Sequence, residues 1–151
     1  MERALRQKLP GGRFQNVSQT RAKAMAAIRG KDNKTTERKL RMALVRAKLT
    51  GWILHPKSIS GRPDFFFPQS QLAVFVDGCF WHGCPQCGHL PKRNSDFWKA
   101  KIERNHERDA KNSEKLRECR IHVIRIWEHE LAEVMPDCIA RIKAALRCST
   151  T

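Results

Sequence analysis

The sequence predicts a single α/β domain, in which a central mixed β-sheet lies between helices on both of its faces. Some segments carry apolar residues at helical spacing, whereas others are short apolar runs bounded by Gly or Pro, as in buried strands. Their order along the chain is helix, helix, three strands, helix, strand, helix, which is typical of a layered domain. A chain of 151 residues is long enough for one such domain with one core.

The N-terminal part is expected to hold a flexible arm followed by two helices. Residues 1–18 are basic and have no periodicity, so we expect a flexible arm there and the folded domain over residues 19–148. Ala22–Ile28 is rich in helix-forming residues and predicts a first helix. Glu37–Leu49 predicts a stronger one, with apolar residues on one face and basic residues on the other.

Three strands are predicted next. Trp52–His55, Phe65–Phe67 and Leu72–Val76 are apolar runs, and a proline ends each of the first two. The tight connection between the second and third runs predicts a β-hairpin. Its two ends carry Asp64 and Asp77, which we expect to lie close together.

A long helix is predicted over Ser95–Arg120, with an apolar stripe formed by Trp98, Ile102 and Leu116. Asn105 and Asp109 fall on the same stripe. Polar residues on a face turned toward the core are expected at functional sites. A last strand over Ile121–Trp127 and a C-terminal helix from Pro136 complete the fold.

The chain is strongly basic, with 30 Lys and Arg against 15 Asp and Glu and a formal charge of +15. Such a charge destabilises a compact domain unless a polyanion is its normal partner, and this favours nucleic acid. A solvated basic surface and an anionic membrane surface are the alternatives. No apolar run reaches the roughly 18 residues of a membrane span and no signal peptide is evident, so a cytoplasmic or nucleoid-associated protein is expected.

Three of the six cysteines lie within nine residues, at Cys79, Cys84 and Cys87. Without a secretory signal, such a cluster is typical of metal ligands rather than disulfides. A structural zinc site needs four ligands, and His129 is the preferred fourth, with His89 and His82 nearer in sequence. Buried thiols without a metal are the alternative.

Acidic and imidazole side chains predict a second, catalytic site. Asp64 and Asp77 at adjacent strand ends would suit Mg²⁺, although each is also a common turn residue. His82 has the right pKa range for a general acid or base, and Asp109 could orient it. Glu37 is a possible third acid, or simply an acidic residue favoured in the first turn of a helix.

Phe80 and Trp81 adjoin these groups. Aromatic residues in a loop usually belong to a core. On a basic protein they could instead insert between base pairs and unstack a duplex.

Four motifs together resemble the very-short-patch-repair (Vsr) endonucleases: G-R-P-D-F at 61–65, V-F-V-D-G-C-F-W-H-G-C-P at 74–85, F-W-K-A-K-I-E-R-N-H-E-R-D at 97–109 and I-R-I-W-E-H-E at 124–130. The resemblance runs in unbroken order from about Thr20 to Leu131. It implies a restriction-endonuclease-like three-layer fold with a structural zinc. It also implies nicking of DNA on the 5′ side of the thymine in a T:G mismatch, a lesion left by deamination of 5-methylcytosine.

The resemblance also implies roles for single residues. Asp64 matches the main Mg²⁺ ligand, His82 the catalytic histidine with Asp109 as its support, and Glu37 a further acid. The remaining matches are Phe80 and Trp81, with Met25 as an apolar wedge, for intercalation, and Cys79, Cys84, Cys87 and His129 for zinc. Val76 and Asp77 depart from the best-known Thr-His pattern. Val76 can still offer its carbonyl to Mg²⁺, and Asp77 is a carboxylate that could bind the metal directly.

The expected protein is therefore a bacterial, Mg²⁺-dependent, zinc-braced endonuclease that acts on double-stranded DNA with a T:G mismatch. A monomer suffices for nicking, and mismatch-repair proteins are the further partners that the resemblance suggests. Two alternatives stay open: a nuclease of the same fold with restriction-type cleavage, and a non-catalytic zinc-containing module that binds DNA.

Overall fold

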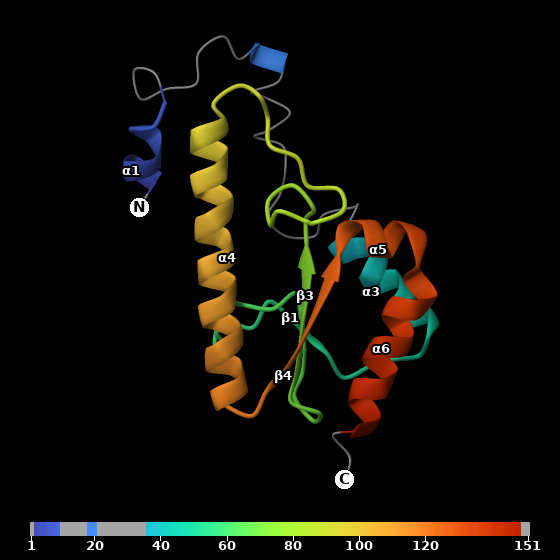
Figure 1. Cartoon of the computed structure of the whole chain (residues 1–151). Coiled ribbons are helices and arrows are strands. Elements are labelled where there is room, and N and C mark those ends of the chain that lie inside the picture. Colours follow the sequence, from blue (N-terminus) through green and yellow to red (C-terminus); the bar gives the residue numbers. More distant parts are fainter. Residues whose placement is uncertain (1, 10–17, 21–35, 149–151) are drawn as a thin grey trace.

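The structure is a computed structural model, and it describes residues 2–9, 18–20 and 36–148 (Figure 1). Within these ranges the helices are α1 (Glu2–Arg6), α3 (Glu37–Arg46), α4 (Ser95–Glu118), α5 (Glu128–Glu133) and α6 (Met135–Cys148). The strands are β1 (Ile53–Leu54), β2 (Phe65–Phe67), β3 (Leu72–Asp77) and β4 (His122–Trp127).

The four strands form one mixed sheet in the order β1-β2-β3-β4. The first three strands are antiparallel neighbours, and the β2–β3 hairpin pairs Phe65 with Val74. β4 runs parallel to β3, with Asp77 opposite Trp127. A parallel neighbour needs a long crossover, and α4 supplies it. The predicted mixed sheet is confirmed.

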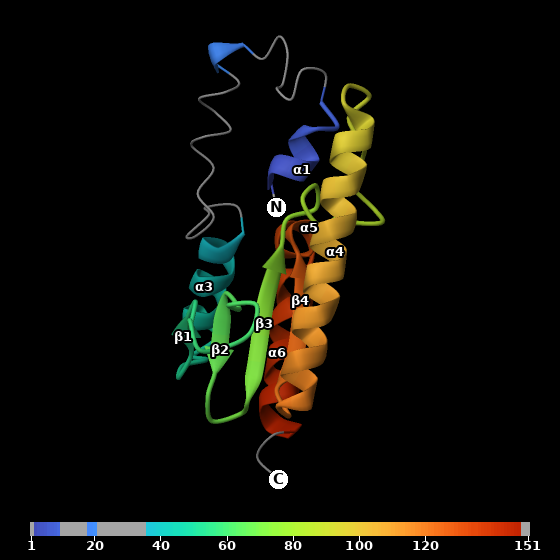
Figure 2. The same cartoon turned by 90° about the vertical axis from the view of Figure 1, so that its left-hand side faces the viewer.

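Helices cover both faces of the sheet, as predicted (Figures 1 and 2). Side chains alternate along a strand, so the three consecutive phenylalanines of β2 serve both faces. Phe65 and Phe67 pack with residues of α3, α5 and α6 in one core, whereas Phe66 packs with α4 in the other. The larger core consists of Leu40, Leu44, Phe65, Phe67, Leu72, Val74, Ile126, Leu131, Cys138 and Ile142.

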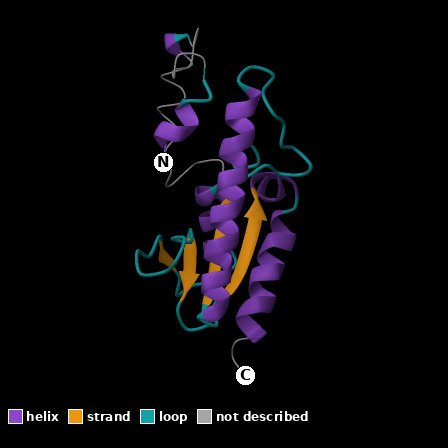
Figure 3. Cartoon of the chain, turned by 60° about the vertical axis from the view of Figure 1, so that its left-hand side comes forward, coloured by secondary structure: helices purple, strands orange, loops and turns teal. Residues whose placement is uncertain are grey.

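Of the helices in the described part of the chain, α4 is the one that lies over the second face (Figure 3). Its C-terminal half contributes Leu116 to a core that also contains Phe66, Ala73, Phe75 and Ile121. Its N-terminal half extends past the end of β3, beside the cysteine-containing loop (Figure 1). One helix therefore anchors in the core and also reaches the segment where the predicted site residues lie.

Two helices were not predicted. α1 occupies part of the expected arm, and its segment buries Leu5 and Leu9 against Phe97 of α4. No periodicity is visible there because α1 has only five residues. α5 follows β4 directly and is also short, with six residues. The helix predicted over Ala22–Ile28 lies outside the described residues.

The other predicted elements are confirmed, with small differences at their ends. α3 stops three residues earlier than expected, at Arg46, and β1 keeps only two residues of its predicted run. None of the described helices combines the length and the apolar character needed to cross a membrane.

Candidate active site

The loop of residues 78–94 leads from the end of β3 into α4 (Figure 1). Chemically reactive side chains gather at this end of the sheet. Three groups in the described part of the chain hold at least three potential metal ligands, with the ligand atoms of each group within 4.8 Å of one another. The groups are Cys79–Cys84–Cys87–His129, Asp77–His82–Asp109 and Glu37–His55–Asp64.

The first group brings together the three clustered cysteines and His129. The Cys84 and Cys87 sulfurs are 3.8 Å apart, and His129 Nδ1 lies 3.3 Å from Cys79 Sγ and 3.5 Å from Cys84 Sγ. A tetrahedral zinc with usual bond lengths has edges of about 3.8 Å between sulfurs and about 3.6 Å between sulfur and nitrogen. The donor set and its spacing therefore fit zinc. His89 does not belong to this group.

The loop backbone holds these thiols in place. Cys84 N–H donates to the Cys79 carbonyl (2.9 Å), and Gly88 N–H donates to the Cys84 carbonyl (2.8 Å). A Cβ at Gly88 would lie 2.4 Å from that Cys84 carbonyl oxygen, so only glycine fits this turn. Burial raises the pKa of the Cys84 thiol, but hydrogen bonds from the Cys87 and Gln86 backbone outweigh it and lower the pKa to about 7. A thiolate is the form that binds metal.

The second group contains a histidine oriented by a carboxylate. His82 Nδ1 lies 2.7 Å from Asp109 Oδ2 of α4. Partial burial raises the pKa of Asp109, but the hydrogen bond and charge of His82, together with Arg125 and Arg108, outweigh it and keep the pKa below its ordinary value. An ionised Asp109 accepts a hydrogen bond from the Nδ1–H group of His82. The lone pair of the other ring nitrogen is then available as a base.

Three polar residues of α4, Asn105, His106 and Asp109, all contact the loop. Asn105 Nδ2 donates to the Trp81 carbonyl at 2.8 Å, and His106 Nε2 contacts the carbonyl of His82. With Asp109, they attach the backbone and the ring of the Trp81–His82 segment to α4. The sequence predicted Asn105 and Asp109 as functional departures from the apolar stripe, but it missed His106, which is adjacent to Asn105 in sequence.

Asp77 belongs to the ligand group of His82, whereas Asp64 belongs to that of Glu37 and His55. The two carboxyl groups are still close enough, as expected, for the charge of Asp77 to raise the pKa of Asp64. Arg125 Nη1 donates to both oxygens of Asp77, at 2.9 and 2.8 Å. Asp77 Oδ1 also lies 3.8 Å from His82 Nδ1. Sequence reasoning missed Arg125, whose position directly opposite Phe75 on β4 follows only from the strand register.

The third group surrounds Asp64 with Glu37 and His55. Asp64 Oδ2 accepts a hydrogen bond of 2.7 Å from the Val76 backbone, which places Val76 beside it. His55 Nε2 lies 2.8 Å from Glu37 Oε1, and the Glu37 side chain is almost fully buried. Burial, together with the charges of Glu37 and Asp77, raises the pKa of Asp64 to about 6, against the Val76 hydrogen bond and His55. A carboxyl group whose pKa is raised in this way is typical of a functional site.

The loop aromatics are half-buried and form a cluster with α4. Phe80 and Trp81 contact each other edge to face at 5.2 Å, and their ring centroids lie 5.3 and 5.9 Å from that of Trp98. The Lys101 amine lies 6.0 Å from the Trp81 ring centroid. Surfaces that stack on nucleic-acid bases combine aromatic side chains with nearby basic residues, as Phe80, Trp81 and Lys101 do here. Met25 lies outside the described residues.

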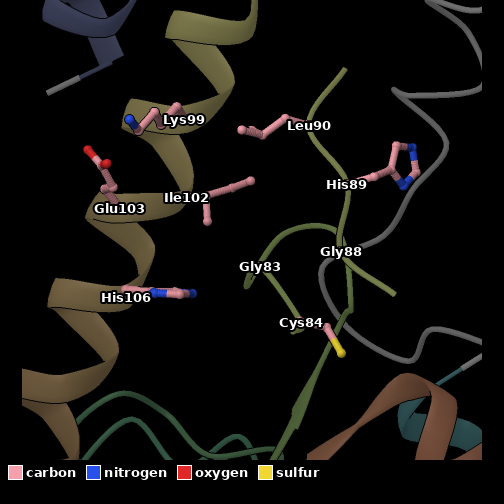
Figure 4. Close-up of a pocket in the computed structure, with 9 residues that line it drawn as sticks. All are labelled: Gly83, Cys84, Gly88, His89, Leu90, Lys99, Ile102, Glu103 and His106. Carbon is pink, nitrogen blue, oxygen red and sulfur yellow. The ribbon is translucent and has the colours of Figure 1, made fainter. Parts of the chain in front are cut away.

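A pocket of about 190 Å³ separates the loop from the N-terminal half of α4 (Figure 4). It is lined by Gly83, Cys84, Gly88, His89, Leu90, Lys99, Ile102, Glu103 and His106. Gly83 has φ +61°, and a Cβ there would lie 2.7 Å from Ile102 Cγ2, so a glycine permits the close approach of loop and helix. The loop is thus held to α4 by hydrogen bonds on one side of a small gap.

Comparison of the amino-acid sequence with known proteins points to one family. The family model described as "DNA mismatch endonuclease Vsr" matches residues 16–88. The chain is 33% identical over 111 residues to the DNA mismatch endonuclease Vsr of Escherichia coli (strain K12), a match that covers 72% of this chain and 69% of that protein. It is also 37% identical over 120 residues to the Type II nicking enzyme V.NmeDIP of Neisseria meningitidis serogroup C, covering 76% of this chain and 81% of that enzyme.

A further nicking enzyme matches over a shorter segment. The chain is 41% identical over 81 residues to the Type II nicking enzyme V.NaeI of Lentzea aerocolonigenes, covering 54% of this chain. The chain spans 47% of the length of V.NaeI and 54% and 60% of two other nicking enzymes. All the relatives named above are described as nicking enzymes or mismatch endonucleases.

Proposed function

Because the chain belongs to the family of Vsr DNA mismatch endonucleases, we propose that it is a divalent-cation-dependent endonuclease that nicks one strand of duplex DNA. The observation that carries this proposal is the pair His82–Asp109, 2.7 Å apart, beside the acidic group of Asp64 at the same end of the sheet. The formal charge of +15 suits a DNA substrate.

In the proposed reaction the chain's own residues activate water and position the phosphate. Asp109 holds the His82 ring, so the free ring nitrogen can take a proton from the attacking water. Asp64 and Glu37, with the Val76 carbonyl, are the proposed holders of Mg²⁺, which when bound supplies positive charge to the phosphate. Asp77 is more removed from this role, because Arg125 already contacts both of its oxygens.

The remaining parts of the molecule have proposed structural and DNA-binding roles. Zinc held by Cys79, Cys84, Cys87 and His129 braces the loop that presents His82, within a restriction-endonuclease-like fold. Phe80 and Trp81 would leave their cluster with Trp98 and stack on base pairs beside the lesion, with Met25 as a second wedge. The protein acts as a monomer on nucleoid DNA.

The proposed substrate is a T:G mismatch, cut on the 5′ side of the thymine as in repair of deaminated 5-methylcytosine. The name of the Escherichia coli relative, a DNA mismatch endonuclease, supports a mismatch as the substrate. A second candidate is restriction-type or otherwise broader cleavage, and the relatives described as Type II nicking enzymes favour keeping it in view. Both candidates use the same catalytic groups and differ in what they recognise.

Cleavage of end-labelled duplexes separates the two. One duplex carries a single T:G mismatch, a matched one is fully paired, and each is incubated with Mg²⁺ and again after chelation. We expect a Mg²⁺-dependent nick in the thymine strand of the mismatched duplex alone. Cutting of both duplexes, or of both strands, would replace the repair function with the broader one. Binding without cleavage under any divalent cation would reject both.

A further inference from the structure

The Glu37–His55–Asp64 group contains an imidazole that the proposed function does not use. His55 Nε2 lies 2.8 Å from Glu37 Oε1, and all three ligand atoms of the group lie within 4.8 Å of one another. The side chains are largely withdrawn from solvent, with 15% of His55 and 5% of Glu37 exposed. A nitrogen donor therefore stands beside two carboxylates in a site that was expected to offer only oxygen.

The strand pairing fixes His55 in this position. Leu54 of β1 pairs with Phe65 of β2, which brings His55, just after β1, next to Asp64, just before β2. His55 N–H also points to the Asp64 carbonyl at 3.4 Å, a long continuation of the ladder. Glu37 lies in the first turn of α3. This helix packs on the face of the sheet that carries Phe65 and Phe67 (Figure 2). Three separate elements thus converge on one point.

The spacing of the donors fits a six-coordinate cation. With bonds of about 2.1 Å, adjacent ligands of an octahedral ion are about 3.0 Å apart and opposite ones about 4.2 Å apart. The separation of 2.8 Å between His55 and Glu37 matches adjacent positions, and the limit of 4.8 Å leaves Asp64 within reach of the same ion. Two carboxylates and a neutral imidazole carry a charge of −2, which a divalent cation balances.

The nitrogen donor bears on which cation is preferred. Mg²⁺ is a hard ion that takes oxygen ligands and keeps its waters, whereas first-row transition-metal ions gain more from imidazole. The neighbouring Asp77–His82–Asp109 group is a poorer site, since the Arg125 guanidinium lies 2.8 Å from Asp77. The thiol-rich group suits zinc, as described above.

We propose that His55 is a direct nitrogen ligand of the divalent cation held by Glu37 and Asp64, and that it makes this site bind Mn²⁺ more tightly than Mg²⁺. The proposal rests on the proposed function, because the cation is the one that the nuclease would use. It adds a ligand that sequence reasoning missed and a stronger preference for Mn²⁺ than two carboxylates alone would give.

Electron paramagnetic resonance of Mn²⁺ added to the full-length, zinc-containing protein tests this without DNA. One Mn²⁺ should bind per chain, and pulsed spectra of the bound ion should show coupling to an imidazole nitrogen. Asp64→Asn should remove this binding, which locates the ion. His55→Gln replaces the nitrogen with an amide oxygen, so the coupling should vanish. Mn²⁺ affinity should then fall about tenfold or more, while Mg²⁺ affinity, measured by competition, changes less than about threefold.

The control is His122→Gln, which alters an exposed histidine on β4, at the end of the sheet opposite the site, and should change neither affinity. Bound Mn²⁺ without nitrogen coupling in the wild type would overturn the proposal whether or not the variants fold. So would an equal loss of both affinities in His55→Gln, which would indicate a structural role in holding Glu37. The nuclease function is tested separately: nitrogen coupling without DNA nicking would reject that function and keep the ligand.

Discussion

The raised pKa of Asp64 predicts that the proposed cation ligand destabilises the free protein. Its carboxylate is buried between β2 and the hydrogen-bonding backbone of Val76, and its pKa rises from 3.8 to about 6. An acid with a raised pKa in the folded state opposes folding when it is ionised. Asp64→Asn removes that charge and keeps an oxygen that can accept the same hydrogen bond. The substitution should therefore stabilise the protein at neutral pH.

The magnitude follows from the two pKa values. A difference between 3.8 and about 6 corresponds to about 3 kcal/mol, at about 1.4 kcal/mol per pH unit. The penalty is absent below the unfolded pKa of 3.8. It grows as the pH rises toward the folded pKa and is complete above it. The variant should thus exceed the wild type by about 1 kcal/mol at pH 4.5 and by about 3 kcal/mol above pH 7.

Denaturant unfolding of both proteins between pH 4.5 and 8, in buffer without added divalent cation, measures this difference. The substitution leaves the proposed zinc site unchanged, so any loss of zinc at low pH would affect the two proteins alike and cancel in the comparison. Added Mg²⁺ should then stabilise the wild type and close the gap, because only the wild type keeps the ligand. A stability difference that does not change with pH, or a less stable variant at pH 7.5, would refute the assignment of a buried, ionised Asp64.

Other substitutions test the rest of the site. Asp109→Asn should reduce nicking about 10³- to 10⁴-fold with DNA affinity unchanged, by analogy with asparagine at the same position of a catalytic triad. The control Asp96→Asn, on the exposed face of α4, should be neutral in the same single-turnover assay. Gly88→Ala should lower the zinc content measured by atomic absorption, because its Cβ would lie 2.4 Å from a loop carbonyl; full zinc occupancy would contradict the turn. Arg125→Met should destabilise by about 2–3 kcal/mol by leaving Asp77 buried and unpaired, and adding Asp77→Asn should restore most of that loss in thermal unfolding.

Local patterns in the sequence were sufficient for most of the fold. The apolar runs ended by Pro56 and Pro68 gave β1 and β2, and the stripe of α4 gave a helix that begins at Ser95 as predicted. Periodicity cannot reveal elements shorter than about two turns. α1 and α5 were missed for this reason, and the burial of Leu5 against Phe97 depends on a contact between distant segments.

Local patterns in the sequence also indicated part of the site. The polar residues on the inner face of α4 indicated Asp109, and the cysteine spacing indicated a cluster that His129 completes in space. The roles of Arg125 and His55 depend on strand order and register, which single residues do not encode. Asp64 and Asp77 approach each other as expected, but they fall in different ligand groups, and Asp77 contacts Arg125 and His82.

The groups at the end of β3 are proposed to cut DNA. Single-turnover nicking of a T:G duplex by the wild type, Asp64→Ala and His82→Ala, with the affinity of each for the same duplex, tests this directly. We expect a loss of nicking of at least about a thousandfold in both variants, with dissociation constants within about threefold of the wild type. Wild-type nicking by either variant would contradict the claim.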